Sequence, residues 1–114
     1  MLDGRQNAAG LTGELLETGL FRSGLKINHL RLILAIDDHR RISAAADSLG
    51  ISQPAAPRML AEIEAIVKAP ICERVARGVE LTRYGEALAR RARTIFLELR
   101  EAAREINELK TGSG

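Results

Sequence analysis

Apolar residues recur every three or four positions along most of the chain, a spacing that predicts helices rather than strands. The first such run extends from Ile27 to Asp38 and includes Leu30 and Ile33. Asn28 has a residue type that often caps a helix, and the charged residues around Asp38 end the apolar run. We therefore expect a first helix over Ile27–Asp38.

Two more helices are expected directly afterwards, joined by a tight turn. Ser43 has the residue type of an N-cap, and the alanine-rich stretch after it stops at Gly50, which readily takes the positive φ that ends a helix. Ser52 then caps a third helix that runs to about Val67, with Pro54 in its first turn. A short helix, a glycine turn and a capped second helix make a helix-turn-helix.

The segment 71–81 has a different character, because its apolar residues flank the sequence Ala76-Arg77-Gly78. This pattern predicts two short strands around a glycine-containing turn. Thr82 follows as an expected N-cap for a long helix from about Arg83 to Leu109. The expected fold is therefore mainly α: a winged helix-turn-helix with a two-stranded wing and a long terminal helix.

The long helix carries an apolar seam whose members are alternately four and three residues apart. A helix of this length spans about 40 Å, more than a core of this size can cover, so a second chain is expected to cover the seam. Charged residues such as Arg93 and Arg104 lie off the seam and are expected to face solvent. The expected dimerisation residues are Leu88, Ala92, Ile95, Leu99, Ala102, Ile106 and Leu109.

Glycines interrupt residues 1–24, at a cost to helix stability of about 1 kcal/mol each relative to Ala. We expect a loosely ordered arm there, with a docked helix as the alternative. Residues 25–82 then form the winged domain, residues 83–110 the dimerisation helix, and residues 111–114 the start of a hinge.

The composition fits a helical domain and offers no sign of catalysis. Aromatic residues make up 3% of the 114 residues, so the core must consist of Leu, Ile, Val and Ala. The net charge of +2 permits a nucleic-acid partner without arguing for one. Glu62 and Glu64 are interpreted as helix surface charges, and His29 and His39 have no partner at metal-ligand spacing. We therefore expect no enzyme activity, no cofactor and no metal.

The single cysteine, Cys72, excludes an intramolecular disulfide and fits a reducing cytoplasm. Its expected role is that of a small apolar residue. No apolar run approaches the roughly 20 residues of a membrane span, and the first twenty residues do not resemble a signal peptide. Cytoplasmic localisation without membrane contact is expected.

The helix-turn-helix carries side chains suited to double-stranded DNA. The N-terminus of a helix attracts phosphate, Gln can pair with adenine and Arg with guanine in the major groove, so Gln53 and Arg58 are the principal expected contacts. Arg77 at the wing tip could enter a minor groove. A protein-interaction module without DNA binding remains the alternative. The expected DNA contacts are Arg31, Ser43, Ser52, Gln53, Pro54, Arg58, Arg74, Arg77 and Thr82.

Several blocks of sequence then point to one family. They are Ser43-Ala44-Ala45-Ala46, Leu49-Gly50-Ile51-Ser52-Gln53-Pro54-Ala55, Arg58, Glu64, Glu73-Arg74, and Gly78-Val79-Glu80-Leu81-Thr82-Arg83-Tyr84-Gly85. From about Leu25 to Leu109 the chain resembles the LysR-type transcriptional regulators, and the resemblance extends to members that regulate sugar uptake. It implies a linker helix that pairs antiparallel with its twin, and binding to palindromic promoter sites as a dimer or tetramer. A small-molecule inducer would act only through a C-terminal domain, which this chain is expected to lack.

Two positions depart from the family pattern. Pro57 stands where Ser is usual, and it cannot donate an N–H toward the carbonyl of Gln53. We therefore expect a loose or bent first turn in the third helix, and this position is the best support for the alternative without DNA binding. Ile71-Cys72 stands where Leu-Phe is usual, which removes one aromatic ring from the packing of the wing.

Overall fold

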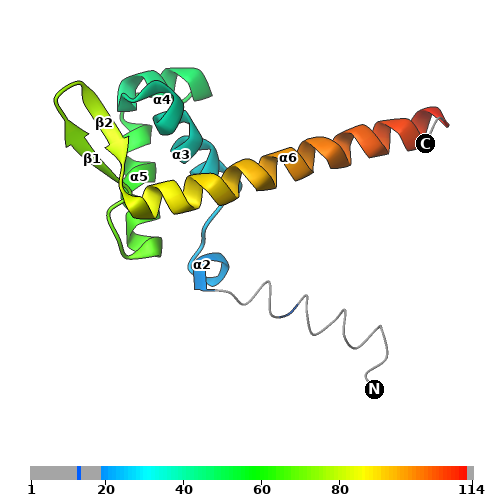
Figure 1. The fold of residues 1–114 in the computed structure, drawn as a ribbon, viewed down its shortest axis with the longest axis horizontal. Helices are drawn as coiled ribbons and strands as arrows, with labels where there is room; N and C mark the ends of the chain where they lie inside the picture. The colour runs from blue at the N-terminus through cyan, green and yellow to red at the C-terminus, as the bar shows by residue number, and fades with distance from the viewer. Residues whose placement is uncertain (1–12, 14–18, 113–114) are drawn as a thin grey trace.

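The computed structural model describes residue 13 and residues 19–112, and it shows a helical head from which one long helix projects (Figure 1). The expected mainly α fold with a two-stranded wing is confirmed. The elements are α2 (Gly19–Arg22), α3 (Ile27–His39), α4 (Ile42–Leu49), α5 (Ala55–Val67), β1 (Cys72–Val75), β2 (Gly78–Leu81) and α6 (Arg83–Thr111).

The core of the head is built around α3, against which α4, α5, β2 and α6 all pack. Leu32, Ile33 and Ile36 on α3 are fully buried, and Ile63 of α5 and Ile71 before β1 meet them in the same cluster. These side chains are aliphatic, as the low aromatic content requires. The core therefore fixes α5 and the wing relative to one central helix.

The N-caps of the three helices α3, α4 and α5 are not the residues that were expected. Lys26 rather than Asn28 is the N-cap of α3, and Arg41 rather than Ser43 is the N-cap of α4. Pro54 occupies the N-cap position of α5, while the backbone carbonyl of Ser52 accepts a hydrogen bond from the Ala55 N–H at 3.0 Å. The Ser and Asn side chains were therefore wrongly assigned as caps.

The end of α4 agrees with the expectation. Gly50 has a φ of 69°, and its N–H donates to the carbonyl of Asp47 at 3.1 Å. The Ile51 N–H donates to the carbonyl of Ala46 at 3.1 Å, which completes a Schellman-type end. The chain can then turn sharply and begin the second helix of the helix-turn-helix.

Pro57 is accommodated because α5 begins later than expected. The helix starts at Ala55, so Pro57 is its third residue and lies in the first turn. The N–H groups of a first turn have no acceptor within the helix, so a proline there sacrifices no helical hydrogen bond. In place of the expected loose or bent first turn, a separate turn at Gln53 and Pro54 precedes the helix.

The wing is an antiparallel hairpin that is fastened to the loop between α3 and α4. Cys72 pairs with Leu81, and the register ends with Val75 opposite Gly78. The Val79 N–H donates to the carbonyl of Arg40 at 2.9 Å. Gly78 has a φ of 136°, and a Cβ built on it would lie 2.2 Å from the same carbonyl oxygen.

The first turns of α6 pack on the head. Ala89 is buried, and Ala92 is fully buried, while Leu88 is partly buried against the same core. The assignment of Ala92 to a dimer seam is therefore wrong, because its own domain already covers it. Arg93 is exposed, as expected, and it also links α6 to α3 through ion pairs with Asp37 at 2.7 Å and with Asp38 at 3.4 Å.

The N-terminal arm is described only in part, since residues 1–12 and 14–18 lie outside the described residues. Within residues 19–24, α2 forms a single helical turn. Among the described residues, no helix has the length and apolarity needed to cross a membrane. The same part of the chain contains no group of three or more side chains suited to hold a metal ion.

Replacing Gly78 with Ala is expected to lower the free energy of unfolding by about 2–3 kcal/mol, because the new Cβ meets the Arg40 carbonyl in a backbone conformation that only glycine adopts readily. Gly50→Ala is the matched control: its φ is also positive, but nothing lies within 4 Å of the added Cβ. That variant should lose about 1 kcal/mol. Urea unfolding followed by circular dichroism measures both, and equal losses would show that the close contact with Arg40 is not what restricts Gly78.

Candidate nucleic-acid interface

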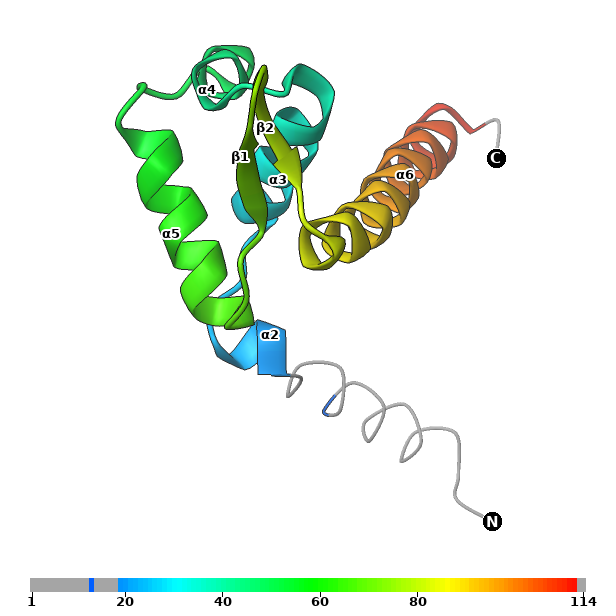
Figure 2. The same ribbon diagram turned by 60° about the vertical axis from the view of Figure 1, so that its left-hand side comes forward.

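Three exposed parts of the molecule lie at one end of the head. Figure 2 shows α4, the start of α5 and the turn between β1 and β2 at the end opposite α2. Ser52, Gln53 and Pro54 form the exposed turn that leads into α5, and Arg58 is exposed one turn further along the helix. An exposed helix start with a hairpin at the same end of the head suits a duplex groove and its edge.

Gln53 is held in place by the first helix of the helix-turn-helix. Its Nε2 donates to Oδ1 of Asp47 at 3.0 Å and to the backbone carbonyl of Ser43 at 3.3 Å. Ser43 therefore contributes its carbonyl to this arrangement, and its exposed hydroxyl is not part of it. With both amide hydrogens directed at α4, the Oε1 atom is the group that can accept a hydrogen bond from a base edge.

Arg58 extends from α5 and, among the residues that the structure describes, has no hydrogen-bond partner of this kind. It is exposed, between Pro57, which is also exposed, and the partly buried Met59. The burial of Ala56 and Ile63 on the inner face of α5 leaves Arg58 on the outer face. A guanidinium in this position can reach either a base edge or a phosphate.

The wing has two faces of different charge. The strand register pairs Arg74 with the buried Val79, and Glu73 with Glu80. Directly opposite residues of an antiparallel pair share one face, so Arg74 lies on the inward side and the two glutamates lie together on the outward side. Arg77 is exposed in the turn. The exposed basic side chains of the wing are therefore Arg74 and, at the tip, Arg77.

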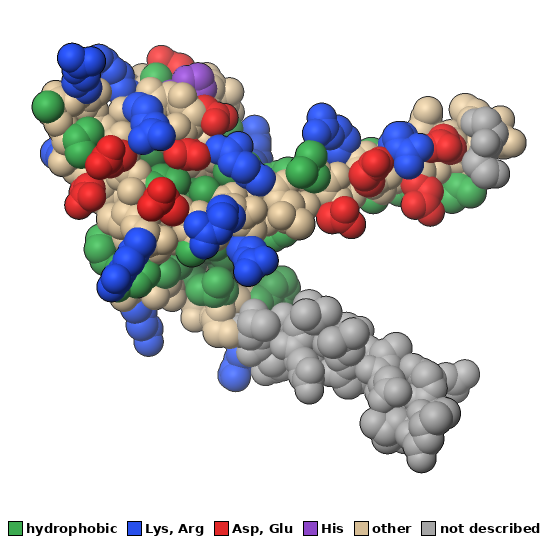
Figure 3. All heavy atoms as spheres, in the orientation of Figure 1, with side chains coloured by type: hydrophobic (Ala, Val, Ile, Leu, Met, Phe, Trp, Pro, Cys, Tyr) green, Lys and Arg blue, Asp and Glu red, His purple; other side chains and the backbone are tan. Residues whose placement is uncertain are grey.

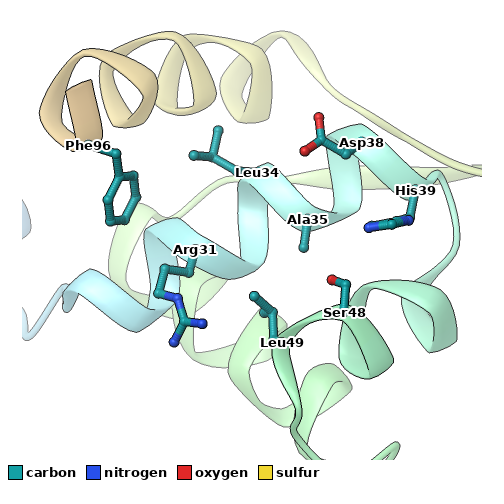
Figure 4. Close-up of a pocket in the computed structure, with 8 residues that line it drawn as sticks. All are labelled: Arg31, Leu34, Ala35, Asp38, His39, Ser48, Leu49 and Phe96. Carbon is teal, nitrogen blue, oxygen red and sulfur yellow. The ribbon is translucent and has the colours of Figure 1, made fainter. Parts of the chain in front are cut away.

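Arg31 lies apart from these side chains. It projects from α3 into an open pocket, whose other walls include Leu49 of α4 and Phe96 of α6 (Figure 4). Its Nη1 donates to Oδ1 of Asn28 at 3.2 Å. The structure thus does not bring Arg31 together with Gln53, and its contact with DNA remains a prediction.

Thr82 is the N-cap of α6, as expected. Its Oγ1 accepts a hydrogen bond from the Gly85 N–H at 3.2 Å. The same hydroxyl lies 2.6 Å from the carbonyl oxygen of Pro70 and 3.2 Å from that of Ile71. These contacts join the end of α5, the wing and α6, so the main role of Thr82 is internal, and its contact with phosphate remains a prediction.

Two polar contacts that support α5 were missed from the sequence. The buried His29 accepts a hydrogen bond at Nδ1 from the Lys26 N–H, so its Nε2 carries the hydrogen that faces Oε1 of Glu62 at 3.2 Å. Glu64 is partly buried, and its Oε2 accepts from the Ile71 N–H at 2.8 Å. Glu62 is the exposed surface charge that was expected, with a specific partner in His29, whereas the interpretation of Glu64 as a plain surface charge is wrong.

Cys72 shows the expected character of a small apolar residue. It packs against the core, and burial raises the pKa of its thiol above the ordinary value, with the nearby Glu64 carboxylate acting in the same direction. A thiol with a raised pKa is a poor nucleophile at neutral pH.

Basic side chains stand out on the surface at the wing end and near the start of α6 (Figure 3). Acidic side chains lie among them on the same face, which agrees with the small net charge of +2. Affinity for an anionic partner must therefore come from local placement of arginines rather than from the charge of the whole molecule.

Comparison with known proteins gives a consistent result. The family model of bacterial regulatory helix-turn-helix proteins of the lysR family matches residues 27–86. The HTH-type transcriptional regulator GbpR of Rhizobium radiobacter is 60% identical over 90 residues, which cover 77% of this chain and 30% of that protein. GbpR of Azospirillum brasilense is 44% identical over 91 residues, covering 80% and 27%. The chain spans less than a third of the length of these relatives.

Solved structures show the same fold. The complex of the CbnR DNA-binding domain with DNA has a TM-score of 0.63 at 32% identity, covering 79% of this chain and all of that one. CbnR itself, a LysR family transcriptional regulator, has a TM-score of 0.67 at 28% identity, covering 74% and 29%. The relatives are transcriptional regulators, which agrees with the expectation that the chain is not an enzyme.

Replacing Thr82 with Val should lower the free energy of unfolding by about 1–2 kcal/mol, because the cap and the contact with the Pro70 carbonyl are both lost. Thr82→Ser keeps the hydroxyl and should lose much less. Urea unfolding of both variants measures the difference. A valine variant as stable as the parent chain would show that the hydroxyl does not join the wing to α6.

Proposed function

Because the chain belongs to the LysR family of bacterial regulatory helix-turn-helix proteins, we propose that it binds promoter DNA sequence-specifically through the end of the head that carries α4, α5 and the wing. The observation that carries this proposal is the fixed Gln53 side chain beside the exposed Arg58 at the start of a helix. The regulator works in the bacterial cytoplasm, where its DNA is found.

In this proposal α5 lies in a major groove. Gln53 presents Oε1 to a donor on a base edge, and Arg58 contacts guanine or a phosphate. Ser43, Ser52 and Pro54 lie at the groove edge. Arg74 and Arg77 contact the adjoining backbone and minor groove, where the potential attracts arginine. The acidic outward face of the wing, with Glu73 and Glu80, is directed away from the duplex.

The alternative of an interaction module without DNA binding loses its best support. Pro57 was the reason for it, and its place in the first turn of α5 leaves the helix regular. Structures of LysR DNA-binding domains in complex with DNA share this fold.

We also propose that α6 pairs with α6 of a second copy. Leu99, Ile106 and Leu109 are 50%, 52% and 65% exposed, which is unfavourable for apolar side chains of one helix face. In an antiparallel pair centred near residue 97, Ile106 of one copy lies opposite Leu88 of the other, and Ile95 opposite Leu99. Two-fold symmetry of the pair then implies a palindromic site, bound by a dimer or by a tetramer built from dimers.

In the whole regulator, an inducer acts through a C-terminal domain. The relatives are long enough to contain such a domain, because the matched residues cover only 30% of the Rhizobium radiobacter protein. A role in the regulation of sugar uptake is part of the same proposal, motivated by the sequence resemblance and the two GbpR relatives.

Arg58→Ala should reduce the preference for the natural site over random duplex by about 1–3 kcal/mol, since it removes a base contact. Arg104→Ala is the control, because Arg104 is an exposed arginine of α6 paired with Glu101. Selection of bound duplexes from a random pool, followed by titration at several salt concentrations, measures both variants. Affinity for the parent chain should fall steeply with salt. A flat salt dependence, or no preference for any sequence, would contradict the proposal.

Ile106→Glu should convert the dimer to monomers, because it places a charge in the apolar contact of α6. Leu97→Glu is the matched control: Leu97 is 51% exposed, against 52% for Ile106, and it lies about half a turn away around the helix. Sedimentation equilibrium of the two variants distinguishes them. Equal dissociation of both, or of neither, would refute the assignment of this face to the dimer.

A further inference from the structure

An apolar trough runs beside the first half of α6, on the side of α2. It consists of two neighbouring grooves that share Leu20 of α2. One lies against Tyr84 and Leu88 of α6, and the other extends to Ile95. Figure 3 shows hydrophobic side chains in this angle between α6 and the lower part of the head.

Part of the wall of the trough opposite α6 is formed by residues that the LysR family model does not match. That model begins at residue 27, whereas Leu20 and Phe21 belong to α2. Leu20 is 40% exposed and Phe21 is 57% exposed, and Ile27 beside them is 47% exposed. Three large apolar side chains are exposed in one groove, so burial of this surface by another protein segment is favourable.

The trough is about as long as the exposed apolar stripe Leu99–Leu109 of α6, which a second copy would supply. From Tyr84 to Ile95 the helix rises by about 16 Å, and the stripe from Leu99 to Leu109 rises by about 15 Å. In the antiparallel pair centred near residue 97, this stripe lies opposite residues 85–95 of the other copy. Ile95 belongs both to the trough and to the exposed face, so the two surfaces are continuous.

The charges of α6 favour the same antiparallel occupant. Residues 83–93 contain four arginines and one glutamate, whereas residues 98–110 contain four glutamates against two arginines and one lysine. Antiparallel pairing places the basic half of one helix beside the acidic half of the other. Lys26 lines the trough as well and adds a positive charge at its edge.

We propose that α2 is a clamp for the dimer: the C-terminal half of α6 from a second copy lies in this trough, held between α6 and the side chains of Leu20 and Phe21. The segment before the family domain thereby adds to the self-association of the chain. The inference rests on the proposed function only in taking α6 as the dimerisation helix.

A photo-crosslinking amino acid in place of Phe21 tests the geometry. Unlabelled and ¹⁵N-labelled chains of residues 1–114 are mixed, irradiated and digested, and the crosslinked peptides are identified by mass spectrometry. The expected products join position 21 of one copy to residues 99–109 of the other. Crosslinks confined to one copy would overturn the proposal, and so would links between copies that avoid residues 99–109.

The double variant Leu20→Ser with Phe21→Ser tests the contribution to self-association. Its dimer dissociation constant in sedimentation equilibrium should rise on the order of ten-fold or more, because two apolar side chains no longer cover the partner. Leu97→Ser is the control and should leave the constant unchanged. Circular dichroism melts confirm that each variant is folded.

The combined results separate the two proposals. If the double variant dimerises like the parent chain while Ile106→Glu gives monomers, the clamp is wrong and the α6 dimer stands. If neither change affects the dimer, the α6 pairing itself is wrong. A weaker dimer for the double variant together with crosslinks to residues 99–109 supports the clamp.

Discussion

The burial of one face of α3 is the constraint on which the rest of the structure depends. Leu32, Ile33 and Ile36 are fully buried, and every other large element of the head packs against this helix. At about 1.5–3 kcal/mol for each buried side chain, this contact outweighs the preference for any single cap or turn. The positions of α5 and the wing, and therefore of Gln53 and Arg77, follow from it.

Helix ends and caps were predicted well where the local backbone conformation determines them. Gly50 ends α4 through its positive φ, and Thr82 caps α6. The helix starts were predicted poorly, because a cap contributes only about 1 kcal/mol and packing can override it. The partners of Glu62 and Glu64 could not be predicted at all, since they depend on residues that only the folded core brings together.

The long helix shows the limit of reading a periodic pattern. A repeat of apolar residues identifies a buried face without saying what buries it. What buries the face differs along α6: Ala92 is fully buried within its own chain, whereas Ile106 remains half exposed. Only the three-dimensional contacts separate the part that belongs to the domain from the part available to a second molecule.

Close contacts at the start of α6 attach this long helix firmly to the head. The Thr82 hydroxyl is hydrogen-bonded to the carbonyl of Ile71, just before the wing. A Cβ on Gly85 would lie 2.2 Å from the same carbonyl oxygen, so the helix and the wing are in close contact. The helix has 29 residues and is therefore about 43 Å long. A tilt of about 10° at the start of α6 displaces its far end by about 7.5 Å, roughly twice the rise of one base pair. In the dimer proposed above, small rotations between the two copies of α6 would thus be enough to change the spacing at which the two heads meet a duplex.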